Sequence, residues 1–179
     1  MNFKIKLSER IQMDDIYEIL RLVHDSESRK QELYDLIYGE DEKLGYHAAW
    51  IFTHSSEQDN KWLFARQNEL IDEVLVCKHA GKRRVILNLL YRQPLTEITR
   101  VDFLDFCLEN ISSKELPAIQ SLCLKIAYEL CLSIPELMQE LKTILEMMEA
   151  ELSPAVGSVR KNVLKAMQKG KSLQKGTFR

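Results

Sequence analysis

The sequence is poor in turn-forming residues and has no long apolar run. Its 179 residues include only six glycines and four prolines, which argues against sandwiches and barrels, because their many turns consume these residues. No apolar run approaches the roughly 18–20 residues that span a bilayer, and the first residues lack the apolar stretch of a secretory signal. The four cysteines lie in apolar contexts, as buried thiols do in a reducing compartment. We therefore expect a cytoplasmic protein with no membrane association.

Motifs for catalysis and for cofactor binding are also missing. There is no glycine-rich phosphate loop and no GxSxG elbow. The four histidines lack the spacing of a HExxH-type metal site. The sequence therefore predicts a protein that is not an enzyme and that holds no metal or cofactor. The alternative is an active site assembled from distant residues, for which Glu69, Asp72 and His79 are the first to inspect.

Charge is nearly balanced over the whole chain but uneven along it. The formal net charge of -2 predicts no general attraction to nucleic acid or to anionic lipid. Residues 152–179, however, hold seven lysines and arginines and no acidic residue. Residues 169–179 have the composition of a basic tail. This basic end has three possible targets, namely the acidic body of the chain, nucleic acid or an acidic partner.

Hydrophobic periodicity is helical along almost the whole chain. Apolar residues recur at helical spacing in about nine stretches, and the stripe over residues 119–130 is the longest. The boundaries carry helix chemistry as well. Ser153 followed by Pro154 predicts an N-cap with proline at the first helical position, and Ser133 with Glu136 fits a capping box. The sequence therefore predicts an all-α fold.

Only the first residues depart from the helical pattern. Phe3, Ile5 and Leu7 alternate with polar residues, as in a β-strand. A single strand has no partner within an all-helical chain. We therefore expect residues 1–12 to form an extended arm that lies on the first helices.

Every second predicted helix looks like a repeat of the same unit. These helices begin near residues 43, 83, 117 and 155, a spacing of about 36–39 residues. A two-helix unit at this period implies an α-solenoid, because one helical hairpin cannot bury its apolar faces alone. We expect a single domain over 1–179, with a capping helix at 13–25 and four helical hairpins at 26–168.

This pattern resembles the HEAT-repeat and HEAT-like superfamily. The second helix AVGSVRKNVLKAM looks like the family's xVRxxAxxxL helix, with Val159 and Arg160 as its Val-Arg pair. Gly45 and Gly157 fall at equivalent positions, which is consistent with close helix approach. The resemblance implies a right-handed superhelical stack of helical hairpins and, commonly, a protein-binding scaffold role.

Cations lie beside aromatic residues on the predicted second helices. In a solenoid these helices usually line the concave face, and a cation next to an aromatic ring suits phosphate or an acidic peptide. Salt bridges to the acidic first helices are the alternative role for the arginines. The predicted contact residues, placed by repeat register, are Tyr46, Trp50, Arg83, Arg84, Tyr91, Gln120 and Arg160.

The function that these features favour is a small intracellular scaffold. Its expected partner is another protein or an acidic peptide. A nucleic-acid binder is the alternative and would use the same arginines together with the C-terminal lysines. A related branch of HEAT-like proteins, the alkylpurine DNA glycosylases, uses a cleft that contains Trp, Asp and Arg. Here the segment Trp62-Leu63-Phe64 is followed by no nearby Asp, so glycosylase activity is not expected.

Overall fold

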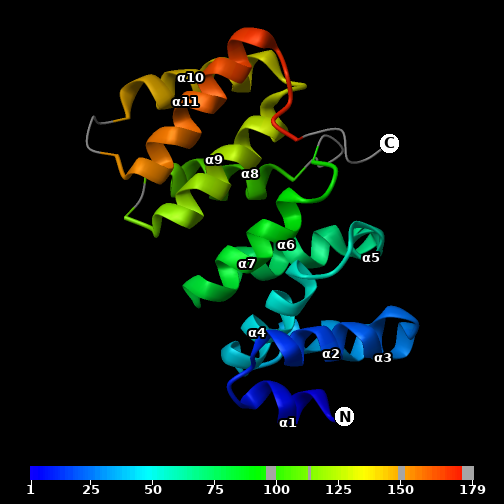
Figure 1. The fold of residues 1–179 in the computed structure, drawn as a ribbon. Helices are drawn as coiled ribbons and strands as arrows, with labels where there is room; N and C mark the ends of the chain where they lie inside the picture. Colours follow the sequence, from blue (N-terminus) through cyan, green and yellow to red (C-terminus); the bar gives the residue numbers. More distant parts are fainter. Residues whose placement is uncertain (96–99, 113, 149–151, 175–179) are drawn as a thin grey trace. The chain divides into compact units, whose positions relative to one another are not determined.

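The computed structural model describes residues 1–95, 100–112, 114–148 and 152–174, and its regular elements there are all helical (Figure 1). This confirms the predicted all-α class. Contacts within the chain define two compact units, Met1–Leu89 (unit 1) and Leu90–Arg179 (unit 2), and each is described by itself. The expectation of one continuous domain over 1–179 stays a prediction.

Unit 1 begins with a helix where an extended arm was expected. The helix α1 (Phe3–Ser8) is capped by Asn2, whose side chain accepts a hydrogen bond from the Ile5 nitrogen. Phe3 and Leu7 are buried, whereas Ile5 is 65% exposed. The prediction of an extended arm was therefore wrong, because apolar residues at alternate positions over five residues also contain an i, i+4 pair that one helix face buries.

The remaining elements of unit 1 follow the predicted stripes. The helix expected over 13–25 is present as α2, although its role as a solenoid cap stays a prediction. Two short 3-10 segments, η1 and η2, lie between helices of unit 1. In chain order the elements are α2 (Met13–His24), α3 (Glu27–Asp35), η1 (Leu36–Tyr38), α4 (Glu42–Thr53), α5 (Glu57–Asn60), η2 (Lys61–Arg66), α6 (Gln67–Val76) and α7 (Ala80–Tyr91), which crosses the boundary between the units.

A constant separation of 35 residues links successive helical layers of unit 1. Tyr34 of α3 donates a hydrogen bond to Glu69 of α6, 35 positions later. Two more pairs with this separation join α3 to η2, where the Trp62 ring nitrogen donates to Glu27 and Arg66 donates to Gln31. The layers are therefore stacked in register. This offset of 35 is close to the repeat spacing that the sequence predicts.

Glycine allows α4 to approach its neighbours closely at one of the two predicted positions. A Cβ atom on Gly45 would lie 2.9 Å from the Ile37 carbonyl oxygen and 2.9 Å from Cε of Lys82. A Cβ on Gly157 would lie 3.9 Å from the nearest atom, an ordinary contact. Close approach is therefore confirmed at Gly45, and the same interpretation was wrong for Gly157.

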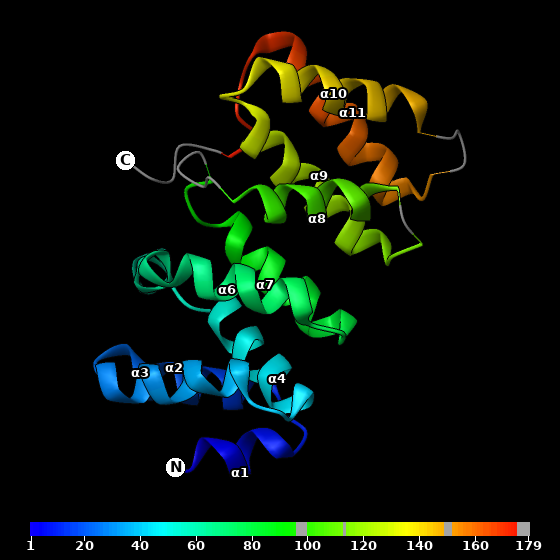
Figure 2. The ribbon, with the colours of Figure 1, turned by 180° about the vertical axis from the view of Figure 1, so that it is seen from behind.

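Unit 2 is organised around one buried helix. Residues 121–124 and 126–131 are all buried, so α9 buries residues on every face, as expected for a helix that is apolar all round. Figures 1 and 2 show α9 packed between α8 on one side and the pair α10 and α11 on the other. Its helices are α8 (Val101–Ile111), α9 (Pro117–Cys131), α10 (Pro135–Met147) and α11 (Pro154–Lys169).

The helix starts of unit 2 confirm one predicted cap and correct another. Ser153 caps α11, because its side chain accepts a hydrogen bond from the Val156 nitrogen, and Pro154 is the first helical residue. The capping box predicted at Ser133 is wrong, since α10 has Ile134 at its N-cap and no side-chain cap. Proline at the first position of α10 already removes one of the orphan donors.

Helix α11 ends at Gly170, where the chain turns. Gly170 has a φ of 57° and a ψ of 37°, a left-handed conformation that glycine adopts without steric cost. The first residues of the predicted basic tail, 171–174, then run back along unit 2, and residues 175–179 of that tail lie outside the described part of the chain. None of the helices in the described residues has both the length and the apolar character that crossing a bilayer requires.

Candidate functional site

Three ring side chains follow one another along α4 and its C-cap. Tyr46, Trp50 and His54 are spaced four residues apart, which places them on one helix face. The rings of Tyr46 and Trp50 are nearly parallel, with centroids 6.3 Å apart, and Trp50 meets His54 edge to face at 5.7 Å. Tyr46 and Trp50 are half-buried and His54 is exposed. We call these residues the α4 row.

The start of α7 supports the α4 row from the side. The ring of His79 lies 5.5 Å from that of Tyr46. Its Nδ1 accepts a hydrogen bond of 3.0 Å from the Lys82 nitrogen, so His79 also satisfies an orphan donor at the start of α7. A Cβ on Gly81 would lie 3.4 Å from the Tyr46 ring. The row is therefore held against the neighbouring helix.

The α4 row leads through His54 into a pocket of about 390 Å³. The pocket lies where the last turn of α2 meets the end of α4 and the start of α5. Its apolar lining comes from Leu20 and from the half-exposed ring of Tyr17, and cationic, acidic and imidazole groups surround it. The lining residues that matter here are Tyr17, Leu20, Arg21, His24, His54 and Asp59.

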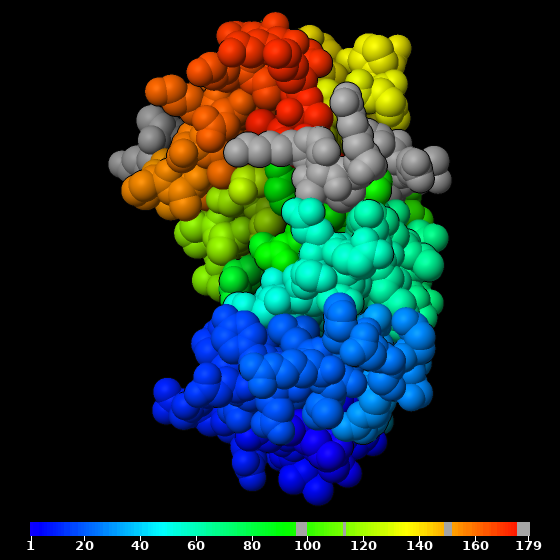
Figure 3. Space-filling view, turned by 45° about the vertical axis from the view of Figure 1, so that its right-hand side comes forward, coloured from blue at the N-terminus to red at the C-terminus, as the bar shows by residue number. Residues whose placement is uncertain are grey.

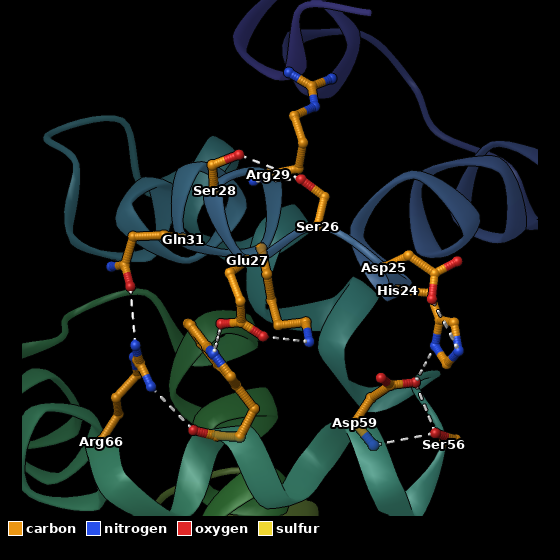
Figure 4. A network of polar contacts seen from close by, with 12 residues as sticks. His24, Asp25, Ser26, Glu27, Ser28, Arg29, Gln31, Ser56, Asp59 and Arg66 are labelled. Atoms are coloured by element: carbon orange, nitrogen blue, oxygen red, sulfur yellow. Dashed lines mark hydrogen bonds and ion pairs between the residues drawn. The ribbon is translucent and has the colours of Figure 1, made fainter.

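A hydrogen-bonded chain of three side chains closes one wall of this pocket (Figure 4). His24 Nδ1 lies 3.0 Å from Oδ2 of Asp59, and the Ser56 hydroxyl donates to the same oxygen at 2.7 Å. Burial raises the pKa of Asp59, but the hydrogen bonds from Ser56 and His24 outweigh it, so that the pKa lies below its ordinary value. Because the carboxylate lies between the serine and the histidine, His24 does not activate Ser56 as a base would in a catalytic triad.

A second polar and aromatic cluster joins α3 to η2. The guanidinium carbon of Arg66 lies 3.3 Å from the Trp62 ring centroid, and Phe52 stacks on Trp62 at 6.2 Å. The Trp62 ring nitrogen donates to Glu27, and this bond keeps the pKa of that carboxyl below its ordinary value. Figure 3 shows that α2 and α3 (blue) and the α5–η2 segment (turquoise) form one continuous surface of unit 1. This cluster holds α3 against η2, next to the elements that line the pocket.

A buried lysine joins three elements of unit 1. Lys82 is 1% exposed, and its ammonium lies 2.6 Å from Glu73 and 3.3 Å from Glu42. Burial lowers the pKa of this lysine, but the two carboxylates outweigh burial and raise it above its ordinary value. A buried charge with paired carboxylates is costly to disturb. Lys82 therefore belongs to the framework of unit 1 and not to its surface.

The structure places two of the predicted contact arginines at helix ends. Arg83 donates through Nε and Nη2 to the Cys77 carbonyl, just past the end of α6. Arg160 donates through Nε to the Leu145 carbonyl in the last turn of α10. Each arginine of a second helix thus satisfies an orphan carbonyl of the first helix before it. That these guanidinium groups also face a groove stays a prediction.

The other predicted contact residues are divided between the units. Tyr46, Trp50 and Arg84 lie in unit 1, and Arg84 is half-buried without a hydrogen bond or ion pair inside the described ranges. In unit 2, the ammonium of Lys125 lies over the Tyr91 ring at 5.4 Å, and burial together with Glu129 raises the pKa of Tyr91 to about 12. Gln120 is half-buried in the first turn of α9. A single groove lined by all these residues stays a prediction.

The residues named for a catalytic alternative serve other contacts. Glu69 accepts a hydrogen bond from Tyr34, His79 caps α7, and Asp72 is exposed. Across the part of the chain that the structure describes, no three histidine, cysteine or acidic side chains gather as a metal site would require. Sequence reasoning missed the pocket, because α5 is too short to show a period. The spacing of 35 between His24 and Asp59 was the one available signal.

Helical hairpins that stack on their neighbours in register define the α-helical repeat class. Within that class, a family model described as a HEAT repeat domain matches residues 3–167. The chain belongs to the HEAT repeat family. Searches of curated proteins and of solved structures gave no significant match. HEAT repeats commonly serve as protein-interaction scaffolds and are generally not enzymes.

Proposed function

We propose that this chain is a non-enzymatic protein-interaction module that binds its partner through the α4 row and the adjacent pocket. The observation that carries the proposal is the stacked pair Tyr46 and Trp50, which remains half-buried although the apolar residues between and after them, Ala48, Ala49, Ile51 and Phe52, are buried. Aromatic anchors next to a pocket are the residues that dominate binding energy at protein interfaces. The family membership supports the same class of function.

The chemistry of this surface also suggests what the partner presents. Leu20 and Tyr17 supply an apolar lining for one anchor side chain, and Arg21 supplies a cation for an acidic neighbour of that anchor. A segment with one apolar anchor therefore suits the site, provided that its acidic neighbour lies beside Arg21 and away from the carboxylates of Asp25 and Asp59. A nucleic-acid role is less well supported, because Arg83 and Arg160 are engaged with helix carbonyls. The four cysteines carry free thiols, which supports a reducing, cytoplasmic location.

Site-specific photocrosslinking tests this proposal. A photoreactive phenylalanine at position 46 is expected to capture one protein from native cytosol, whereas the same group at Val76, which is 71% exposed on α6, is not. The captured protein should then bind the Tyr46→Ala/Trp50→Ala variant at least about tenfold more weakly than the parent chain, because two anchors are lost. Nuclease-sensitive capture at position 46, or equal affinity of the double variant, would overturn the proposal.

A further inference from the structure

We propose that unit 2 holds a second binding site, which reads the backbone of an extended basic segment and which the chain's own residues 171–174 (the strap) occupy as an internal competitor. The inference goes beyond the proposed function, because it uses no residue of the α4 row. Its basis is a fully buried carboxylate on α9 whose only hydrogen-bond donors, within the described ranges, come from the strap.

The carboxylate of Glu129 is the centre of this site. The residue is 1% exposed. Its Oε1 accepts hydrogen bonds from the backbone nitrogens of Leu173 at 2.6 Å and Gln174 at 3.2 Å, and its Oε2 accepts from the Ser172 hydroxyl at 2.7 Å. No lysine or arginine of the described residues forms an ion pair with it. A buried carboxylate without these donors would be costly, so the site requires an occupant.

The groups around Glu129 also address the backbone of the occupant. The Tyr128 hydroxyl donates to the Lys171 carbonyl at 2.7 Å. The side-chain amide of Gln174 donates to the carbonyl of Tyr91, the last residue of α7, and to that of Gln93, just past the helix end. Apart from one hydroxyl and one amide, the strap is therefore recognised through main-chain atoms. Main-chain recognition does not depend on most side chains, so another extended segment fits the same donors and acceptors.

The strap fills this site incompletely. Gln93 is 1% exposed, yet neither its amide nitrogen nor its amide oxygen has a partner among the described residues. Buried polar groups are nearly always hydrogen-bonded. The same residue binds the strap with its carbonyl oxygen, so an unused donor and an unused acceptor belong to a residue of the site. A ligand that reaches them binds better than the strap does.

The position and exposure of the strap also favour its release. It follows the left-handed Gly170 directly, and Lys171 and Ser172 are exposed, whereas Leu173 and Gln174 are only half-buried. Little apolar area therefore opposes its release. A partner segment must supply the same donors, and positive charge on it complements the buried carboxylate. The occupant that we propose is consequently an extended basic segment of another protein, with a small hydroxyl residue at the position of Ser172.

Peptide binding to full-length variants tests this proposal. The probe is a labelled peptide with the sequence GKSLQKG, which corresponds to residues 170–176. The Ser172→Ala/Gln174→Ala variant weakens the strap and leaves the receptor groups intact. We expect this variant to bind the peptide at least about tenfold more tightly than the parent chain, because the internal competitor lowers the fraction of open sites. The Val76→Ala variant, altered only at a position of α6 in unit 1 that is 71% exposed, serves as the control and should match the parent.

Two further arms locate the binding at Glu129. Adding Glu129→Gln to the strap variant, with far-UV circular dichroism to verify its helicity, should reduce peptide affinity at least about tenfold. A peptide with N-methyl leucine at the central position lacks the donor of the 2.6 Å bond and should bind equally poorly. Equal affinity of the parent and the strap variant, or binding that ignores Glu129→Gln, would overturn the proposal. Dimerisation that Glu129→Gln abolishes would assign the site to a second copy of this chain and would also overturn it.

Discussion

Units 1 and 2 are both built from helical hairpins of one family, but different interactions stabilise their interiors. Unit 1 relies on polar side chains, since Lys82 joins Glu42 and Glu73 in its interior and the bonds of His24 and Glu27 tie its successive layers together. Unit 2 relies on α9, which is buried along its length. Its interior contains the cysteines Cys107, Cys123 and Cys131 and the buried carboxylate of Glu129.

The two units also offer different surfaces. Unit 1 presents aromatic side chains of α4, whereas Glu129 and Tyr128 of unit 2 contact the backbone of an extended segment. A helical repeat requires only that successive hairpins bury their apolar stripes. The remaining positions are free to differ, so each unit has its own vulnerability and its own mode of recognition. Variants in one unit should leave the other unit intact.

Removing the buried charge of unit 1 should have the largest effect. Lys82→Met keeps most of the side-chain volume but leaves Glu73 and Glu42 without their cation, and we expect a loss of about 3 kcal/mol in the free energy of unfolding. Both tryptophans lie in unit 1, so their fluorescence in a urea titration measures this loss.

An exposed ion pair in unit 2 provides the control for that loss. Lys142→Met removes the i, i+4 contact with Glu146, which is worth at most about 0.5 kcal/mol. An equal shift for both variants would contradict the role assigned to Lys82. Reactivity of the buried thiols Cys107 and Cys123 reports on unit 2 in the same samples, and we expect it to stay unchanged in Lys82→Met.

The glycines of α4 and α11, Gly45 and Gly157, should respond in opposite directions to substitution by alanine. In Gly45→Ala the new Cβ meets the Ile37 carbonyl, which is backbone and gives little, so we expect a loss of about 2 kcal/mol. Gly157→Ala places its Cβ at an ordinary distance, and we expect a gain of up to about 1 kcal/mol from helix propensity. Urea titrations followed by circular dichroism measure both. A loss in both variants would indicate that α11 is as closely packed as α4.

Serine caps occur in both units, so removing one should lower the free energy of unfolding by a similar amount in each. Ser26 accepts a hydrogen bond from the Arg29 nitrogen at the start of α3, and Ser153 accepts one from Val156 at the start of α11. We expect each substitution by alanine to lower the free energy of unfolding by about 1 kcal/mol. Ser133→Ala, at a position without a cap bond, should change stability by less than about 0.5 kcal/mol. Thermal unfolding of the three variants, with a lower melting temperature for only the first two, checks this expectation.

The fold was predictable because hydrophobic periodicity is a local property of each stretch of sequence. The stripe of 119–130 became α9, and the repeat spacing gave the hairpins. The structure of residues 1–12 was not predictable, since Phe3 and Leu7 fit a strand and a helix equally well over so short a stretch. Tyr46 and Trp50 could be placed by helix register alone. The hydrogen bonds of Arg83 and Arg160 could not be predicted, because tertiary packing brings to them the helix-end carbonyls that accept these bonds.

Acid should destabilise unit 1 more than unit 2, and we expect this to be the smallest of the proposed effects on stability. Three carboxyls that tie elements of unit 1 together have lowered pKa values: Asp15 through Lys6 of α1, Glu27 through Trp62 and Asp59 through Ser56 and His24. In unit 2, among the described residues, Asp102 also has a lowered pKa, but its partner Arg100 is only two residues away. A lowered pKa contributes stability that is fully present above the unfolded pKa of about 4 and that is lost as the pH falls through the folded value.

The expected result is an earlier loss of unit 1 between about pH 4 and pH 2, because the ties among α1, α2, α3 and α5 weaken there while α9 keeps its apolar contacts. Thermal unfolding at pH 7 and at pH 3 measures it, with tryptophan fluorescence for unit 1 and far-UV circular dichroism for the whole chain. At pH 3 the fluorescence transition should precede the loss of helix. Asp15→Asn/Asp59→Asn should reduce this pH dependence, because the variant has already lost two of the charges that titrate. Coincident transitions at pH 3 would show that the units, despite their different chemistry, unfold as one.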